Sequence, residues 1–159
     1  MARAHRDNAP TVRLRGRNAR VVTTLNRSAL LDGNLPIDPL GWSVITSGLN
    51  PADGTMSLLF GNAAAIEHAR TQGGGDYPSG TILSMVTWRQ QEDLRWLGAN
   101  IPAPPSTVEF VTARAAEDAR VAFEYRKFEG VPLRETAIPA KLAAGPIAWL
   151  LARRAAVMP

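Results

Sequence analysis

Histidine, cysteine and serine, on which metal binding and nucleophilic catalysis most often rest, occur in few useful combinations in this chain. There are two histidines, His5 and His68, and no cysteine. The lack of cysteine excludes disulfides, thiolate metal sites and cysteine nucleophiles. Glu67 adjoins His68, but neighbouring residues on a helix point about 100° apart and do not readily share a ligand. Ser79 stands in Tyr-Pro-Ser-Gly, which is not the G-x-S-x-G turn of a nucleophile elbow.

These observations predict no catalytic residue and no metal site. His68 is expected in solvent or at the edge of the core, with a role in proton transfer or metal binding as the alternative. The glycines at 73–75 follow a helix-like segment and precede a strand-like one. A phosphate-binding loop has the reverse order, strand before helix, so the glycines are expected to form a loop only.

Composition indicates one folded domain. The chain has 159 residues, of which 45% are hydrophobic and 20% charged, values that are typical of globular proteins. No stretch approaches the roughly 20 consecutive apolar residues of a membrane-spanning helix. Charge is concentrated at the beginning, because residues 1–27 hold seven arginines against one acid, Asp7, a net charge of +6. With +4 for the whole chain, the rest carries −2.

We interpret residues 1–27 as a basic N-terminal arm and residues 28–159 as a single domain. The arm is either solvated or docks on a protein partner through Arg13, Arg15, Arg17 and Arg20. Nucleic acid or lipid is the least favoured target, since the arm has no aromatic residue on which bases could stack.

Hydrophobic patterning predicts mostly strands. Apolar and polar residues alternate, or β-favouring residues cluster, over residues 21–25, 42–46, 55–60, 81–89, 108–112 and 121–128. Asn62 is expected to cap a helix over 63–70. A short helical piece is expected over 113–119, and a C-terminal helix is expected to begin at Pro146 and continue through Met158. The predicted fold class is α+β, mainly an antiparallel sheet of about five strands with two or three short helices.

An ordered series of short motifs resembles the cytochrome P-460 family over roughly residues 30–158. The motifs are, in order, residues 42–45, Leu59-Phe60-Gly61-Asn62, Ala65, Arg70, Tyr77-Pro78-Ser79-Gly80-Thr81-Ile82-Leu83, Trp88, Val108-Glu109-Phe110-Val111, and Tyr125 followed by Gly130-Val131-Pro132-Leu133. The resemblance implies a bacterial, exported and dimerising sheet domain with one c-type haem, as in hydroxylamine-oxidising and gas-binding cytochromes. It therefore implies a periplasmic location, whereas a cytoplasmic one follows if Met1 is the native start.

The chain departs from that family where the haem would be attached. The family's Cys-x-x-Cys-His corresponds to Ala137-Ile138-Pro139-Ala140-Lys141. Alanine forms no thioether, and a lysine amine with an ordinary pKa of about 10.4 costs roughly 4.6 kcal/mol to deprotonate at pH 7. No lysine lies between residues 54 and 126 to form the cross-link to the haem ring seen in the hydroxylamine oxidisers. We therefore expect no cofactor, with non-covalent haem as the minor alternative.

A haem pocket without haem has to be filled, since about 300 Å³ of void costs on the order of 7 kcal/mol. The bulky residues predicted to fill it, or to line it if it binds a ligand, are Met85, Trp88, Phe110, Phe123 and Trp149. The favoured function is a haem-free, non-catalytic accessory subunit that binds other proteins or a second copy of itself. The alternative is a binder of small molecules or non-covalent haem with redox or gas-binding chemistry.

Overall fold

A computed structural model describes residues 26–71, 75–116 and 120–156. The four arm arginines Arg13, Arg15, Arg17 and Arg20, and the strand expected over 21–25, lie outside the described residues. Within them, Arg27 is the first residue of a short 3₁₀ helix, η1 (Arg27–Ala29), and a second one, η2 (Pro39–Gly41), precedes the first strand.

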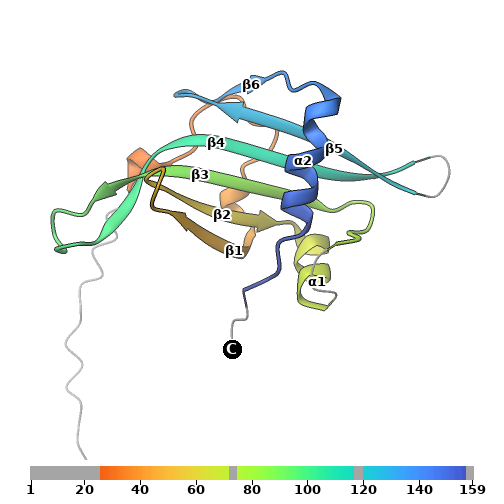
Figure 1. The fold of residues 1–159 in the computed structure, drawn as a ribbon, viewed down its shortest axis with the longest axis horizontal. Helices are drawn as coiled ribbons and strands as arrows, with labels where there is room; N and C mark the ends of the chain where they lie inside the picture. The colour runs from red at the N-terminus through yellow and green to blue at the C-terminus, as the bar shows by residue number, and fades with distance from the viewer. Residues whose placement is uncertain (1–25, 72–74, 117–119, 157–159) are drawn as a thin grey trace, which may run out of the picture.

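Six antiparallel strands form one sheet in which each strand lies beside the next along the chain (Figure 1). The strands are β1 (Ser43–Asn50), β2 (Thr55–Gly61), β3 (Ile82–Glu92), β4 (Asn100–Ala115), β5 (Val121–Glu129) and β6 (Arg134–Thr136). With the helices α1 (Ala63–Thr71) and α2 (Ala140–Leu151), this confirms the predicted fold class. The short strand β6 was not anticipated.

Alternate side chains of β3 pack on opposite faces of the sheet, as its sequence predicts. Leu83 and Met85 belong to the core under the helices. Val86 and Trp88 belong to a second core on the other face. Its neighbours β2 and β4 pair with it along most of its length, with Leu59 opposite Met85 and Val108 opposite Val86. The side chains on its two faces are buried by the elements that pack on each face of the sheet.

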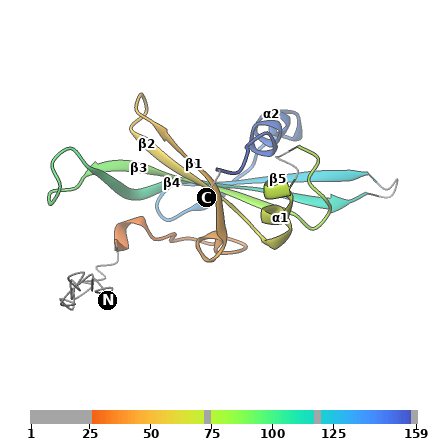
Figure 2. The same ribbon diagram turned by 90° about the horizontal axis from the view of Figure 1, so that it is seen from below.

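Each face of the sheet has its own cover. On one face α1 and α2 contribute Ala65, Ala69 and Leu150 to a core with Leu59 and Val111. Figure 2 shows α2 on this side and the N-terminal segment, residues 26–42, on the other. The residues of that segment that pack against the second core are Ala29, Leu31, Leu35, Leu40 and Trp42.

The C-terminal helix differs from the prediction. It begins at Ala140, six residues before Pro146, and ends at Leu151 rather than continuing through Met158. Pro146 lies inside the helix, where it removes one backbone hydrogen bond. Burial of Ala143 and Leu150 against the sheet, together with the helix-favouring residues before the proline, compensates for that loss. After the helix the chain returns to the sheet, where the N–H of Ala156 donates to the carbonyl oxygen of Ile45 at 2.8 Å.

The prediction of a short helical piece over 113–119 is wrong for residues 113–116, the part that the structure describes. Residues 113–115 form the end of β4, with Ala113 opposite Phe123 and Ala115 opposite Val121. Alanine favours helix in isolation, but pairing with β5 and the burial of Ala113 outweigh that preference. Residues 117–119 lie outside the described residues.

Candidate functional site

The positions that the family resemblance assigns to the haem-attachment motif lie at the junction of β6 and α2. Ala137, Ala140 and Lys141 are all exposed to solvent there. The two alanines offer no sulfur, and an exposed lysine is a well-hydrated ammonium rather than a neutral ligand. The residues present therefore do not fit a covalently attached haem.

His68 is the only histidine among the described residues, and it lies away from that junction. It belongs to α1, and its ring centroid is 4.4 Å from that of Tyr77. The end of α2 that packs with α1 is its C-terminal end, at Leu150. Lys141 precedes Leu150 by nine residues, or about 13.5 Å of helix. His68 is thus at the core edge, as predicted, with a buried Nε2 that has no hydrogen-bond partner among the described residues.

The five residues predicted to fill one pocket are distributed over both faces of the sheet. Met85 and Phe123 pack under the helices, whereas Trp88 and Phe110 belong to the opposite core. Trp149 lies on α2 with 49% of its surface exposed, and the guanidinium carbon of Arg153 is 3.5 Å from its ring centroid. Met85 and Trp149 do meet at one hollow of about 290 Å³, between α2 and the strands β1 to β3. The structure does not gather all five around one cavity.

An apolar groove of about 500 Å³ opens on the other face, between the N-terminal segment and the β1–β2 hairpin. Its apolar walls are formed by Ala29, Leu30, Leu40, Leu49, Met56, Leu58, Trp88 and Pro102. The groove holds its shape because the indole nitrogen of Trp88 donates a hydrogen bond to the carbonyl oxygen of Ala29 at 2.8 Å. Of its lining residues, the sequence had singled out only Trp88. The feature of the sequence that could have indicated the groove is the set of leucines at positions 30, 31, 35 and 40. These leucines indicate a segment that packs against the sheet, although it has no regular periodicity.

The groove runs beside an open edge of the sheet. Strand β1 is at the end of the strand order, and its residues Ser47, Gly48 and Leu49 line the groove. Ala156 bonds to this edge at Ile45, and among the described residues no further backbone hydrogen bond reaches the edge between Ile45 and Asn50. An edge of this kind presents free N–H and C=O groups to a partner strand.

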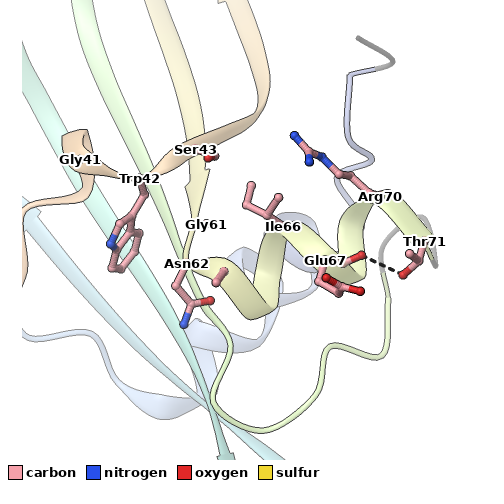
Figure 3. Close-up of a pocket in the computed structure, with 10 residues that line it drawn as sticks. Gly41, Trp42, Ser43, Gly61, Asn62, Ile66, Glu67, Arg70 and Thr71 are labelled. Atoms are coloured by element: carbon pink, nitrogen blue, oxygen red, sulfur yellow. Dashed lines mark hydrogen bonds between the residues drawn. The ribbon is translucent and has the colours of Figure 1, made fainter. Parts of the chain in front are cut away.

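A second, polar pocket of about 510 Å³ lies beside α1 (Figure 3). Figure 3 shows Trp42 and Asn62 at one end of it and Arg70 and Thr71 at the other. Its polar groups already serve the fold: the Asn62 Oδ1 accepts from the N–H of Ala65 at 3.1 Å, which confirms the predicted cap, and its Nδ2 donates to the carbonyl oxygen of Gly80 at 2.8 Å. The Thr71 hydroxyl donates to the carbonyl oxygen of Glu67 at 2.8 Å. The two charged residues that line the pocket, Glu67 and Arg70, are both exposed and opposite in charge, and they do not make a specific site.

Polar side chains on the helix-covered face tie β4, β5 and β6 together. The hydroxyl of Tyr125 donates to the carboxylate of Glu109, and Lys127 and Thr136 contact Glu129 at 2.7 and 3.0 Å. Burial, followed by the hydrogen bond to Glu109, raises the pKa of Tyr125. The hydrogen bond from Lys127 lowers the pKa of Glu129. These contacts hold β4, β5 and β6 together on this face of the sheet.

Neither a metal site nor a membrane-spanning helix is found in the described part of the chain. Within residues 26–71, 75–116 and 120–156, no three His, Asp or Glu side chains come together as metal ligands. No helix in those ranges is long and apolar enough to cross a bilayer.

Comparison with known proteins identifies the family. The chain matches the family described as Cytochrome P460 over residues 40–140, which is more than half of its length. No curated protein matches it. The match runs from η2 through all six strands to Ala140, the first residue of α2. It includes Ala137 and ends one residue before Lys141. On the extent of this match, the chain belongs to the cytochrome P460 family.

Proposed function

We propose that this chain is a haem-free member of its family that acts as a non-catalytic accessory subunit and binds another polypeptide in its apolar groove. The observation that carries the proposal is the groove itself, about 500 Å³ of largely apolar surface beside an open strand edge. An exposed apolar hollow of this size on a small domain is typical of an interaction site.

The absence of haem is supported by the chemistry at the β6–α2 junction. A c-type haem needs two sulfurs and an axial base, whereas Ala137 and Ala140 supply methyl groups and Lys141 a solvated ammonium. Several bulky side chains are also buried in the two cores of the sheet. Trp88 and Phe110, each about 96–97% buried, fill the core on one face, and Met85 fills the core on the other.

The geometry favours an extended segment as the occupant. A partner segment that paired with residues 46–50 as an additional strand would form backbone hydrogen bonds with the free edge of β1. Every second side chain of that segment would enter the groove. Leu49, Met56 and Leu58 line that path, so the partner segment should carry apolar residues at alternate positions. Leu49 is 70% exposed and is therefore available to such a segment.

Capture from extracts of the source cells, followed by reconstitution with the purified partner, tests the proposal. Leu49→Asp places a charge in the groove, and Leu142→Asp makes the same change at an exposed leucine on α2, outside the groove. One polypeptide should bind the wild type and Leu142→Asp in a fixed ratio and be lost with Leu49→Asp. In the reconstituted complex, amide NMR signals of residues 46–50 should shift.

Equal binding by Leu49→Asp, or no stoichiometric polypeptide, would contradict the proposal. Light scattering of the purified chain distinguishes a second copy of itself from a different partner, and a dimer unaffected by Leu49→Asp would place self-association outside the groove.

The size of the groove also favours a second candidate, a small apolar ligand. Ligand pockets usually enclose about 300–1,000 Å³ and combine apolar walls with a few polar groups, and here Asn26, Ser47 and Ser57 supply such groups. Saturable binding of an apolar ligand or of free haem that Leu49→Asp abolishes, without any polypeptide partner, would favour this function.

A further inference from the structure

A hollow of about 290 Å³ lies on the helix-covered face of the sheet, between the C-terminal end of α2 and the strands β1 to β3. Among the described residues, Arg153 is the one charged residue that lines it, and no acid does. Most of the other lining residues carry a hydroxyl or an amide, namely Thr46, Ser47, Asn50, Thr55, Ser57 and Thr87. The hollow is therefore polar and carries a single positive charge, in contrast to the apolar groove on the opposite face.

The guanidinium of Arg153 is held in place by the ring of Trp149. Its central carbon is 3.5 Å from the ring centroid, the arrangement of a stacked cation–π pair. Its side-chain N–H groups have no acceptor within the described part of the chain. A guanidinium that stacks on an aromatic ring through its flat face can still present its N–H edge to a ligand. The donors of Arg153 are thus oriented and unused.

Two hydroxyl groups lie side by side in the wall formed by the sheet. Ser57 on β2 is directly opposite Thr87 on β3. Leu59 and Met85, two positions away on the same strands, belong to the core under the helices. Because side chains alternate along a strand, both hydroxyls face this same side of the sheet. Neither has a hydrogen-bond partner within residues 26–71, 75–116 and 120–156.

A glycine leaves one of these hydroxyls uncovered. Gly48 on β1 is opposite Ser57, and a Cβ at Gly48 would lie 3.1 Å from Oγ of Ser57. Any larger residue at this position would crowd that oxygen. The edge of the sheet is therefore open at the point where Ser57 lines the hollow.

The groups around the hollow match a small anion that carries hydroxyl groups of its own. An arginine side chain pairs with a carboxylate through two parallel hydrogen bonds, and one carboxylate balances its single charge. Free hydroxyls both donate and accept, so they complement the hydroxyls of a ligand. The half-exposed indole of Trp149 adds an apolar wall for a carbon skeleton. The volume is close to the lower end of the range for small-molecule sites, about 300 Å³.

We propose that this hollow binds a small polyhydroxylated carboxylate of the sugar-acid class, with its carboxylate on Arg153 and its hydroxyls on Ser57 and Thr87. A neutral sugar would leave the donors of Arg153 without an acceptor. A phosphate dianion would bring a second charge, for which the lining holds no second cation. The inference does not depend on the groove, because Thr87, Trp149 and Arg153 line the hollow and not the groove.

Titration of the purified full chain with D-glucuronate, followed by NMR, tests the inference. The amide signals of residues 46–50, 55–57 and 87 and the indole N–H signal of Trp149 should shift together and saturate. D-Glucose has hydroxyls without a carboxylate, and acetate has a carboxylate without hydroxyls. Each should bind about tenfold or more weakly than glucuronate, because it can make only one part of the contacts.

Variants of Arg153 test the carboxylate contact. Arg153→Gln should weaken glucuronate binding about tenfold to a hundredfold, because charge-assisted hydrogen bonds are lost. Arg153→Lys should also weaken it severalfold, since lysine keeps the charge but not the paired donors. Arg154→Gln is the matched control: it removes the neighbouring charge, which does not line the hollow, and should leave binding unchanged.

Variants of threonine test the hydroxyl contact. Thr87→Val removes the hydroxyl and should weaken glucuronate binding about three- to tenfold. Thr112→Val is its control, because Thr112 is opposite Ile82, which packs in the core on the other face of the sheet.

Several outcomes would overturn the inference. They are no saturable shift at millimolar glucuronate, equal binding by Arg153→Gln or by Thr87→Val, and inorganic phosphate or acetate bound as tightly as glucuronate. The comparison of the four probes needs only the natural chain, so the inference stays open to refutation even if a variant does not fold.

Discussion

The indole nitrogen of Trp88 lies 2.8 Å from the carbonyl oxygen of Ala29, and this hydrogen bond joins the middle of the sheet to a segment 59 residues earlier in the chain. Trp88 is 96% buried, and both residues line the apolar groove. The bond therefore fixes the N-terminal segment against the sheet and sets the width of the groove at the same time.

Trp88→Phe tests this role. The substitution leaves the Ala29 carbonyl without its partner and removes part of a buried ring, so we expect the free energy of unfolding to fall by about 1–3 kcal/mol. Urea denaturation measures the change. Trp149→Phe is the matched control: Trp149 is half exposed, and its replacement should change the free energy by no more than about 0.5 kcal/mol. Equal losses in the two variants would show that the bond to Ala29 contributes little.

Gly61 is expected to resist even the smallest side chain. A Cβ at this position would lie 2.7 Å from the Cβ of Ala65 and 2.8 Å from Cδ1 of Ile45. The methyl end of Ile45 can rotate away, but the Cβ of Ala65 is fixed by helix α1. Gly61→Ala should therefore destabilise the fold by about 1–3 kcal/mol through overpacking.

The control for Gly61 is Gly41→Ala, because a Cβ at Gly41 meets nothing within 4 Å. Thermal unfolding of both variants measures the contrast. A Gly61→Ala variant as stable as Gly41→Ala would mean that β2 and α1 are packed less closely than the structure shows.

The two tyrosines of the chain are expected to ionise late. Burial raises the pKa of Tyr77, and burial together with the Glu109 carboxylate raises that of Tyr125, both above the ordinary value of 10.0. A pKa raised by folding contributes stability that is complete below about pH 10 and is lost as the pH rises through the folded-state values.

Absorbance at the tyrosinate band during alkaline titration measures this effect. The native chain should show no ionisation step near pH 10, and the chain in concentrated urea should show both tyrosines ionising there. Tyr125→Phe should leave a single late step. A native step at pH 10 for either tyrosine would contradict the burial described here.

The ion pair between Arg126 and Glu135 gives the chain an acid-sensitive contact between β5 and β6. The two hydrogen bonds measure 2.7 and 2.8 Å, and they lower the pKa of Glu135. Because folding lowers this pKa, the ion pair contributes stability at pH values above the ordinary pKa near 4.5. That contribution is lost as the pH falls through the pKa of Glu135 in the folded state. Glu135→Gln should lower the urea midpoint slightly at pH 7 and not at pH 2. A constant difference at both pH values would assign the effect to packing.

Local patterns in the sequence predicted the centre of the sheet well. The alternation in β3 and the Asn62 cap follow from side-chain direction and backbone hydrogen bonding, which are local properties. The start of α2 and the strand at Ala113 did not follow, because distant contacts decide them: Leu150 packs against the sheet, and Ala113 is paired with Phe123. The first half of β4 was missed since Pro102, Pro104 and Pro105 argue against a strand, although prolines are tolerated where β4 has no neighbour on one side.

The alternation in β3 also explains the distribution of the five predicted pocket residues. Met85 and Trp88 are three positions apart, so a strand must direct them to opposite faces. Since β3 is a strand, Met85 and Trp88 cannot line the same pocket. The groove was beyond prediction for another reason: its outer wall is an irregular segment held by single contacts such as Trp88 to Ala29.

The visible absorption spectrum of the chain tests the central claim most directly. It should be recorded after expression in cells that mature c-type cytochromes, and again after addition of free haem. The triple variant Ala137→Cys, Ala140→Cys, Lys141→His serves as the positive control, since it restores the attachment motif that the maturation machinery recognises. We expect the control to acquire a Soret band that persists under denaturing conditions, and the natural chain to remain colourless and to bind no stoichiometric haem. A Soret band in the natural chain, covalent or saturating at one haem per chain, would contradict the account.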